Sequence, residues 1–98
     1  MRVYISGKIT GNPGYRSDFE QAESQLRDAG FDVMNPAREV YDAGFAEYPY
    51  DQIMAYCLEL LEECDAIYMM ASYKDSNGAK MELKHAKKIG LKVLYEER

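Results

Sequence analysis

Glu82 is the acidic residue of this sequence whose surroundings most clearly indicate chemistry. It lies one turn into a helix predicted over residues 78–89. At about 100° per residue, Ala79, Ala86 and Ile89 fall within about 60° of Glu82, whereas Lys80, Lys84 and Lys87 fall about 140° or more away. The carboxylate is therefore expected on the inward face, where it is costly unless it is paired or used. Attraction to the helix N-terminus, a pair across a subunit interface and a functional role all satisfy this pattern.

Two loops carry the other polar candidates for a binding site. The glycines of the first loop, residues 7–15, either form turns or let the backbone approach a ligand, with two cations nearby. The side chains of the second loop, residues 75–78, either cap the helix that contains Glu82 or help to seat a phosphate at its N-terminus. Aromatic residues between positions 41 and 50 either cover a planar ring or pack a small core. These candidates are Gly7, Lys8, Gly11 and Arg16, then Asp75, Ser76, Asn77 and Gly78, and the aromatic residues Tyr41, Phe45, Tyr48 and Tyr50.

Strands and helices are predicted to alternate along the chain. Short apolar runs indicate the strands, and apolar residues at helical spacing indicate the helices. The order βαβαβαβ predicts an α/β fold with a parallel sheet, right-handed crossovers and helices on both faces. Strands are predicted at 2–6, 31–34, 65–70 and 91–95, and helices at 16–29, 50–63 and 78–89, with a short helical piece near 36–43.

The favoured strand order is 2-1-3-4, as in the front of a flavodoxin-like (Rossmann-like) three-layer fold. The switch point of such a sheet lies between the first and third strands, and ligands bind there at the carboxyl ends of the strands. The loop over 6–15 and the loop over 71–77 therefore converge on one crevice. Tyr4 lies in the first strand, and it is expected to pack in the core with its hydroxyl satisfied.

Length and charge narrow the classes of partner. The 98 residues form one predicted domain, 1–98, with a net charge of −5. The only cluster of lysines lies on the predicted outer face of the last helix, so a nucleic acid polymer is not an expected partner. No apolar run approaches the roughly 18 residues that span a membrane, and no signal peptide is evident, so we expect a cytoplasmic protein. P-loop and dinucleotide-binding glycine motifs are absent.

The cysteines and the single histidine argue against a metal or redox centre. Cys57 and Cys64 do not have the spacing of a metal knuckle or of a CxxC motif. His85 is the only histidine, so a zinc site is not expected. The sequence therefore predicts two buried free thiols in a reducing compartment, with no metal and no cofactor.

Four segments taken together resemble the nucleoside 2-deoxyribosyltransferase-like superfamily, and in particular its short uncharacterised bacterial and phage branch, a domain of unknown function (number 4406). The resemblance covers essentially the whole chain. It implies a flavodoxin-like fold and cleavage of the N-glycosidic bond of deoxynucleosides or their 5′-monophosphates by a glutamate nucleophile. The segments are Val3-Tyr-Ile-Ser-Gly-Lys-Ile-Thr-Gly11, Asn35-Pro36, Cys64-Asp-Ala-Ile and Ser76-Asn-Gly-Ala-Lys-Met-Glu82.

The resemblance also implies roles for particular residues. Glu82 matches the nucleophile, and Tyr4 matches a tyrosine that steadies it. Ser76 and residues 7–11 match regions that hold the 5′-phosphate in the nucleotide hydrolase branch. Related enzymes carry an aspartate that assists the leaving base at the position of Cys57, and a thiol is a poor substitute because it donates and accepts hydrogen bonds weakly. The candidates to replace that aspartate are Asp51 and Asp75.

The expected function is hydrolysis or deoxyribosyl transfer on a nucleoside or a nucleoside 5′-monophosphate. The alternatives are a non-catalytic nucleotide-binding or sensing domain, which Cys57 favours, and a structural scaffold. The resemblance and the short fourth strand, with no further helix, predict a homodimer or a higher homo-oligomer. The predicted catalytic residues are Glu82, Tyr4, Asp51 and Asp75, and the predicted substrate-binding residues are Ser6, Gly7, Lys8, Gly11, Arg16, Ser76, Asn77 and Gly78.

Overall fold

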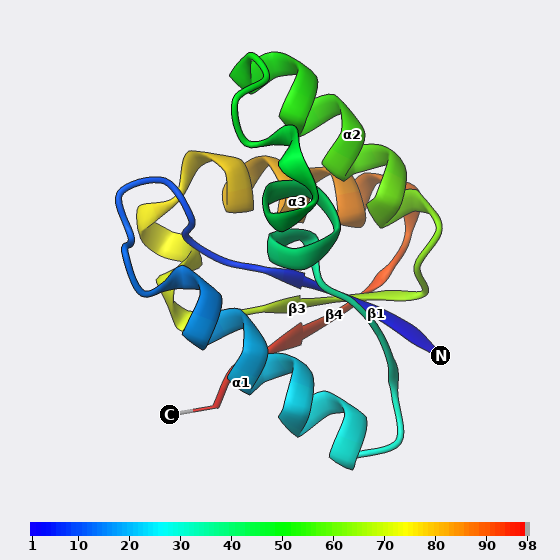
Figure 1. Ribbon diagram of the computed structural model, residues 1–98. Helices are drawn as coiled ribbons and strands as arrows, with labels where there is room; N and C mark the ends of the chain where they lie inside the picture. Colours follow the sequence, from blue (N-terminus) through cyan, green and yellow to red (C-terminus); the bar gives the residue numbers. More distant parts are fainter. Residues whose placement is uncertain (98) are drawn as a thin grey trace.

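A four-stranded parallel sheet forms the centre of the protein, whose computed structural model describes residues 1–97 (Figure 1). The strands are β1 (Arg2–Ser6), β2 (Asp32–Met34), β3 (Ala66–Met69) and β4 (Lys92–Tyr95). Their order in the sheet is β2-β1-β3-β4, and every neighbouring pair is parallel. The predicted α/β class and strand order are therefore confirmed.

Helices cover both faces of this sheet, which gives three layers (Figure 1). Helix α1 (Tyr15–Asp28) lies on one face, where Phe19, Ala22 and Leu26 pack against the sheet. Helices α2 (Tyr50–Glu62) and α3 (Asn77–Ile89) lie on the other face together with the π-helix η1 (Ala37–Phe45). A short 3-10 helix, η2 (Ala71–Asp75), joins β3 to α3.

The two central strands bury side chains on both faces, which explains why they read as continuous apolar runs. In β1, Val3 and Ile5 join the core under α1, whereas Tyr4 joins the core under α2 and α3. In β3, Ala66 and Ile67 divide between the same two cores. The side chain of residue 4 is thereby directed toward α3, the helix that carries Glu82.

Two connections contain more helix than the sequence predicted. The loop expected over 71–77 contains η2. The backbone amide of Ser76, just after η2, donates a hydrogen bond to the carbonyl of Tyr73. The piece expected near 36–43 extends to residue 45 and bends at Gly44, whose φ of 100° lies in the left-handed region that favours glycine. Ile89 is 40% exposed although helical spacing places it beside Glu82, because it is the last residue of α3.

Glu23 in α1 ties this helix to the turn that follows β2. Its carboxylate accepts hydrogen bonds from Asn35 (3.0 Å), Arg27 (2.8 Å) and Arg38 (2.5 Å). Asn35 is itself buried, and its side-chain oxygen accepts a hydrogen bond from the amide of Ala37 at the start of η1. Burial opposes ionisation of Glu23, but these hydrogen bonds outweigh it and lower the pKa to about 2. The network therefore fixes the position of η1 relative to α1.

Replacing Glu23 by Gln is expected to lower the free energy of unfolding by about 1–2 kcal/mol at pH 7. The folded-state pKa of about 2 lies below the ordinary value of 4.5. The carboxylate therefore contributes stability above that ordinary value, and the contribution is lost as pH falls toward the folded-state value. Urea unfolding at pH 7 and pH 3, with the exposed Glu20→Gln as control, measures this. An equal effect of Glu23→Gln at both pH values would contradict the network.

Candidate functional site

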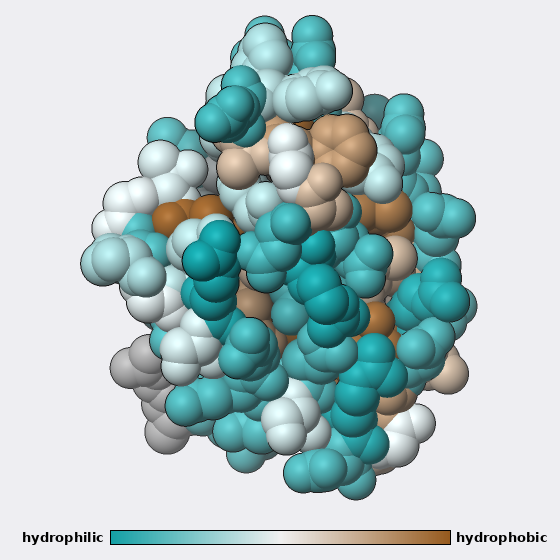
Figure 2. All heavy atoms as spheres, viewed as in Figure 1, coloured by the Kyte–Doolittle hydropathy of each residue, from teal (hydrophilic) through white to brown (hydrophobic). Residues whose placement is uncertain are grey.

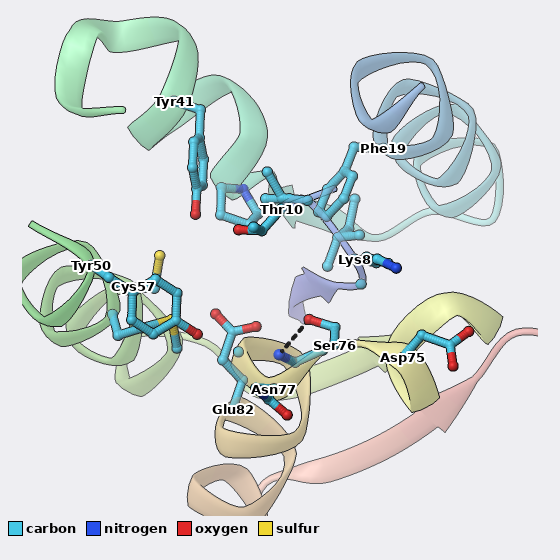
Figure 3. A pocket seen from close by; sticks show the side chains of 17 residues that line it. Lys8, Thr10, Phe19, Tyr41, Tyr50, Cys57, Asp75, Ser76, Asn77 and Glu82 are labelled. Atoms are coloured by element: carbon cyan, nitrogen blue, oxygen red, sulfur yellow. Dashed lines mark hydrogen bonds between the residues drawn. The ribbon is translucent and has the colours of Figure 1, made fainter. Parts of the chain in front are cut away.

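A cavity of about 350 Å³ opens at the carboxyl ends of β1 and β3. The chain after β1 and the start of α3 form one side, and η1 and α2 form the other (Figure 3). This is the position at which parallel α/β sheets bind ligands, because the connections diverge on either side of the switch point. The loops expected to converge there both contribute lining residues, among them Gly7 and Lys8 from the first and Ser76 from the second.

The carboxylate of Glu82 borders this cavity and is bound from below by two hydroxyls of β1. Tyr4 donates a hydrogen bond to Oε2 (2.5 Å), and Ser6 donates one to Oε1 (2.7 Å). Glu82 is only 6% exposed, and Tyr4 is fully buried. The alternation of β1 places Tyr4 and Ser6 on the same face of the sheet, so a single strand supplies both donors.

Burial raises the pKa of Glu82 from the ordinary value of 4.5 to about 7, although the hydrogen bonds from Tyr4 and Ser6 oppose this increase. Burial, and then the charge of Glu82, raise the pKa of Tyr4 well above its ordinary value. Tyr4 therefore remains a neutral donor. Glu82 is close to half ionised at neutral pH, which is a suitable state for a group that gives or takes a bond or a proton.

The side of the cavity formed by η1 and α2 carries Tyr41, Tyr50, Met54 and Cys57. Burial, followed by the negative charge of Glu82, raises the pKa of the Cys57 thiol to about 12. Burial likewise raises the pKa of Tyr41 to about 12, with smaller contributions from Cys57 and Glu82. These groups are neutral at physiological pH, and none of them is a strong proton donor.

Helix α3 begins at the edge of the cavity and is capped there. The Ser76 hydroxyl accepts a hydrogen bond from the amide of Ala79 (3.1 Å), so Ser76 is the N-cap. The first backbone amides of a helix have no hydrogen-bond acceptor within the helix, and those of α3 lie beside the cavity. A Cβ on Gly78 would lie 3.1 Å from the Tyr50 hydroxyl and 3.3 Å from the Met54 sulfur. Gly78 therefore lets α3 approach α2 closely, which is a structural reason for a glycine here.

A comparable packing constraint applies to Gly7 at the end of β1. A Cβ at this position would lie 2.3 Å from the methyl group of Met70 and 3.1 Å from the Ser72 hydroxyl. The Ser72 hydroxyl also accepts a hydrogen bond from the amide of Lys8 (3.0 Å). The first loop is thus held against the chain that follows β3, and this contact shapes the mouth of the cavity.

The structure brings most of the predicted site residues together, and it leaves others apart. Tyr4 and Ser6 lie beneath the cavity, in contact with Glu82. Arg16 is exposed and pairs with Asp42 (2.8 Å), and it is not among the residues that line the cavity. Gly11 and the exposed Asp51 also lie outside that lining. The predicted residues that line the cavity are Gly7, Lys8, Asp75, Ser76, Asn77, Gly78 and Glu82.

Sequence reasoning did not identify Phe19 and Met54 as lining residues. Phe19 has the spacing of a core residue of α1 and is fully buried, so its pattern gave no sign that one edge borders a cavity. The aromatic residues of the second connection divide between two places. Tyr41 and Tyr50 line the cavity, whereas Phe45 and Tyr48 border a separate apolar depression.

Within residues 1–97, no three His, Cys, Asp or Glu side chains are grouped so that they could hold a metal ion. The helices that the structure describes include none with the length and apolarity required to cross a membrane.

Comparisons with known proteins agree with this fold. A family model described as "Domain of unknown function (DUF4406)" matches residues 1–95. The structure is similar to that of a 2-desoxiribosyltransferase from Leishmania mexicana, with a TM-score of 0.71 and 17% sequence identity. That similarity covers 96% of this chain but only 62% of the other one, and at this identity it establishes the fold alone. No curated protein matches the sequence.

Replacing Glu82 by Gln is expected to stabilise the protein more at pH 8.5 than at pH 5. The folded protein binds the Glu82 proton more tightly than the unfolded chain between the ordinary pKa of 4.5 and about 7. The free energy of unfolding therefore decreases as pH rises through this interval, by about 3 kcal/mol when complete. Glutamine removes this dependence because it has no proton to lose.

Thermal or urea unfolding at the two pH values measures the difference, and the exposed Glu59→Gln on α2 serves as control. If Glu82→Gln changed stability equally at pH 5 and pH 8.5, the raised pKa of Glu82 would be wrong.

Proposed function

The chain belongs to the DUF4406 family, and we propose that it cleaves the N-glycosidic bond of a nucleoside or a nucleoside 5′-monophosphate, by hydrolysis or by transfer of the sugar. One observation carries this proposal: the carboxylate of Glu82 borders a cavity of about 350 Å³ while two hydroxyls hold it from below. This volume is within the range of small-molecule sites. A positioned carboxylate is the usual nucleophile in glycoside cleavage.

In the proposed reaction an oxygen of ionised Glu82 attacks C1′ of the sugar and displaces the base, which takes up a proton from solvent. Water or a second base then attacks C1′, loses a proton to solvent and releases Glu82. Tyr4 and Ser6 orient the carboxylate and favour its ionised form, since both donate hydrogen bonds to it. No cofactor is required by this scheme, because the glutamate itself forms and breaks the covalent bond.

In this proposal the two sides of the cavity bind different parts of the substrate. Tyr41 and Tyr50 border the side suited to a planar base. The first turn of α3 and Lys8 border the other side, where amides at a helix N-terminus favour an anionic group such as a 5′-phosphate. Asp75 lies at that end too and extends away from Glu82 (Figure 3).

The similar protein from Leishmania mexicana supports the proposal, because it has the same fold and is a 2-desoxiribosyltransferase. A non-catalytic nucleotide-binding or sensing domain is the second candidate function, and the neutral thiol of Cys57 favours it. In that case nucleotides would raise the melting temperature without any release of base.

Replacing Glu82 by Ala is expected to reduce release of free base by about 1,000-fold or more, because the attacking group is removed. Chromatographic assay of nucleosides and nucleoside 5′-monophosphates measures this, and Glu59→Gln is the matched control. Intact-protein mass spectrometry during turnover is expected to show a sugar adduct on the wild type and none on Glu82→Ala. Full activity of Glu82→Ala would overturn the proposal. Ligand-dependent stabilisation without turnover would instead establish the binding function.

We further propose that the protein forms a homodimer or a larger homo-oligomer. Exposed aromatic residues gather near the start of α2, where the rings of Phe45 and Tyr48 lie 5.3 Å apart and those of Phe45 and Tyr56 lie 5.5 Å apart. They border an apolar depression of about 370 Å³. Figure 2 shows a largely hydrophilic face on which apolar residues appear near the top and also toward the left and right edges. Such patches commonly mark protein interfaces.

Light scattering at micromolar concentration is expected to give at least twice the mass of the single chain. Introducing charge at the 52%-exposed Tyr48, as Tyr48→Glu, is expected to weaken association by about tenfold or more, since a desolvated charge is costly in an interface. Tyr95→Glu, at a comparably exposed aromatic residue on β4, is the control. A single-chain mass for the wild type would refute the assembly.

A further inference from the structure

Among residues 1–97, the part of the cavity next to Glu82 that would receive the base holds only weakly acidic proton donors, namely a thiol and two phenols. Figure 3 shows Cys57 and Tyr50 on one side of Glu82, with Tyr41 above them. Within residues 1–97, the lining contributed by η1 and α2 consists of Tyr41, Tyr50, Met54 and Cys57. It includes no carboxyl group, imidazole or amine.

The acidic groups elsewhere are badly placed to protonate a base on that side. Asp75 lies at the opposite end of the cavity and extends away from Glu82 (Figure 3). Asp51 does not line the cavity, and His85 pairs with Glu62 on the α2–α3 side (2.7 Å). Burial, and then the charge of Glu82, hold the pKa of Cys57 at about 12, too high for an efficient general acid near pH 7.

A neutral purine or pyrimidine that leaves without a proton departs as an anion, which is a poor leaving group when no strong general acid lies beside it. A base that already carries a positive charge on its glycosylated ring departs as a neutral molecule and needs no proton. The side chains of η1 and α2 therefore favour nucleosides with a cationic base over those with a neutral base.

From the walls of this cavity, and resting on the proposed function, we propose that the preferred substrate is an N-glycoside whose base is cationic, such as a pyridinium riboside or an N-alkylated purine nucleoside. An oxygen of Glu82 forms a bond to C1′, and the electron pair of the C1′–N bond neutralises the ring. Water then attacks C1′, breaks the ester to Glu82 and loses one proton to solvent. The net reaction consumes one water and yields free sugar, neutral base and one proton.

Charge and aromatic character in the cavity fit this substrate. Among residues 1–97, Lys8 is the only cationic side chain in the lining, and Figure 3 shows it on the side of Ser76 and Asp75, away from Cys57 and Tyr50. Aromatic rings such as those of Tyr41 and Tyr50 attract cations. A positive charge beside Glu82 also favours its ionised form. Binding of the substrate would thereby activate the nucleophile, whose pKa of about 7 leaves it partly protonated beforehand.

The test compares 7-methylguanosine with guanosine, each as riboside and 2′-deoxyriboside, because the pair differs by the methyl group that makes the base cationic. The rate of base release is measured for each nucleoside with enzyme and without enzyme. The uncatalysed rate is subtracted, and the rate enhancement is the catalysed rate divided by the uncatalysed rate of the same nucleoside. We expect kcat/KM for the methylated nucleoside to exceed that for guanosine by at least about 100-fold. We also expect the rate enhancement for the methylated nucleoside to exceed the rate enhancement for guanosine by more than about tenfold. Glu82→Gln is expected to abolish both activities.

Cys57→Asp supplies the missing proton donor, and Cys57→Ser is its matched control with a weakly acidic hydroxyl. We expect Cys57→Asp to raise activity on guanosine and to narrow the selectivity by about tenfold or more, whereas Cys57→Ser leaves the selectivity unchanged. The wild-type comparison stands alone if the aspartate variant fails to fold.

Equal, Glu82-dependent enhancement for guanosine and 7-methylguanosine would overturn this inference while leaving the proposed function intact. Absence of Glu82-dependent cleavage of every nucleoside in the comparison would overturn the proposed function, and this inference with it.

Discussion

The buried contact between the Glu82 carboxylate and the hydroxyls of Tyr4 and Ser6 is the interaction on which the site depends. It joins the first turns of α3 to the central strand β1. Removing a carboxylate from water is costly, and two hydroxyl donors compensate only part of that cost, so the pKa remains raised to about 7. The fold retains a group that opposes its own stability when ionised, which is characteristic of functional sites.

Close approach of the backbone around this contact determines the shape of the cavity. Gly78 allows α3 to approach Tyr50 and Met54 of α2, and Gly7 allows the end of β1 to approach Met70 beyond β3. Between these two contacts the connections separate at the switch point, and the remaining space is the cavity. At both positions a larger residue would have to displace the neighbouring side chains, independently of any ligand.

The two ends of the cavity differ in their electrostatics. Toward η1 and α2 the side chains are aromatic or thiol groups that remain neutral, whereas Lys8, Asp75 and the start of α3 provide charge and backbone dipoles at the other end. Glu82 lies between them. Under the proposed function, a substrate with a planar part and a polar part would have one favourable orientation, in which the bond between the two parts lies beside the carboxylate.

The sequence by itself determined the fold class and strand order, because alternating apolar periodicities and short connections leave few topologies for a chain of this length. It also identified Glu82, since helical spacing placed a carboxylate among inward residues such as Ala79 and Ala86. Only the tertiary structure decided that Ser6 joins Tyr4 in binding this carboxylate, that Arg16 turns to Asp42, and that Asp51 lies outside the cavity. Periodicity specifies which face of an element a residue occupies. Which side chains meet across elements depends on register and on the close approaches at Gly7 and Gly78, which emerge only when the sheet and helices pack together.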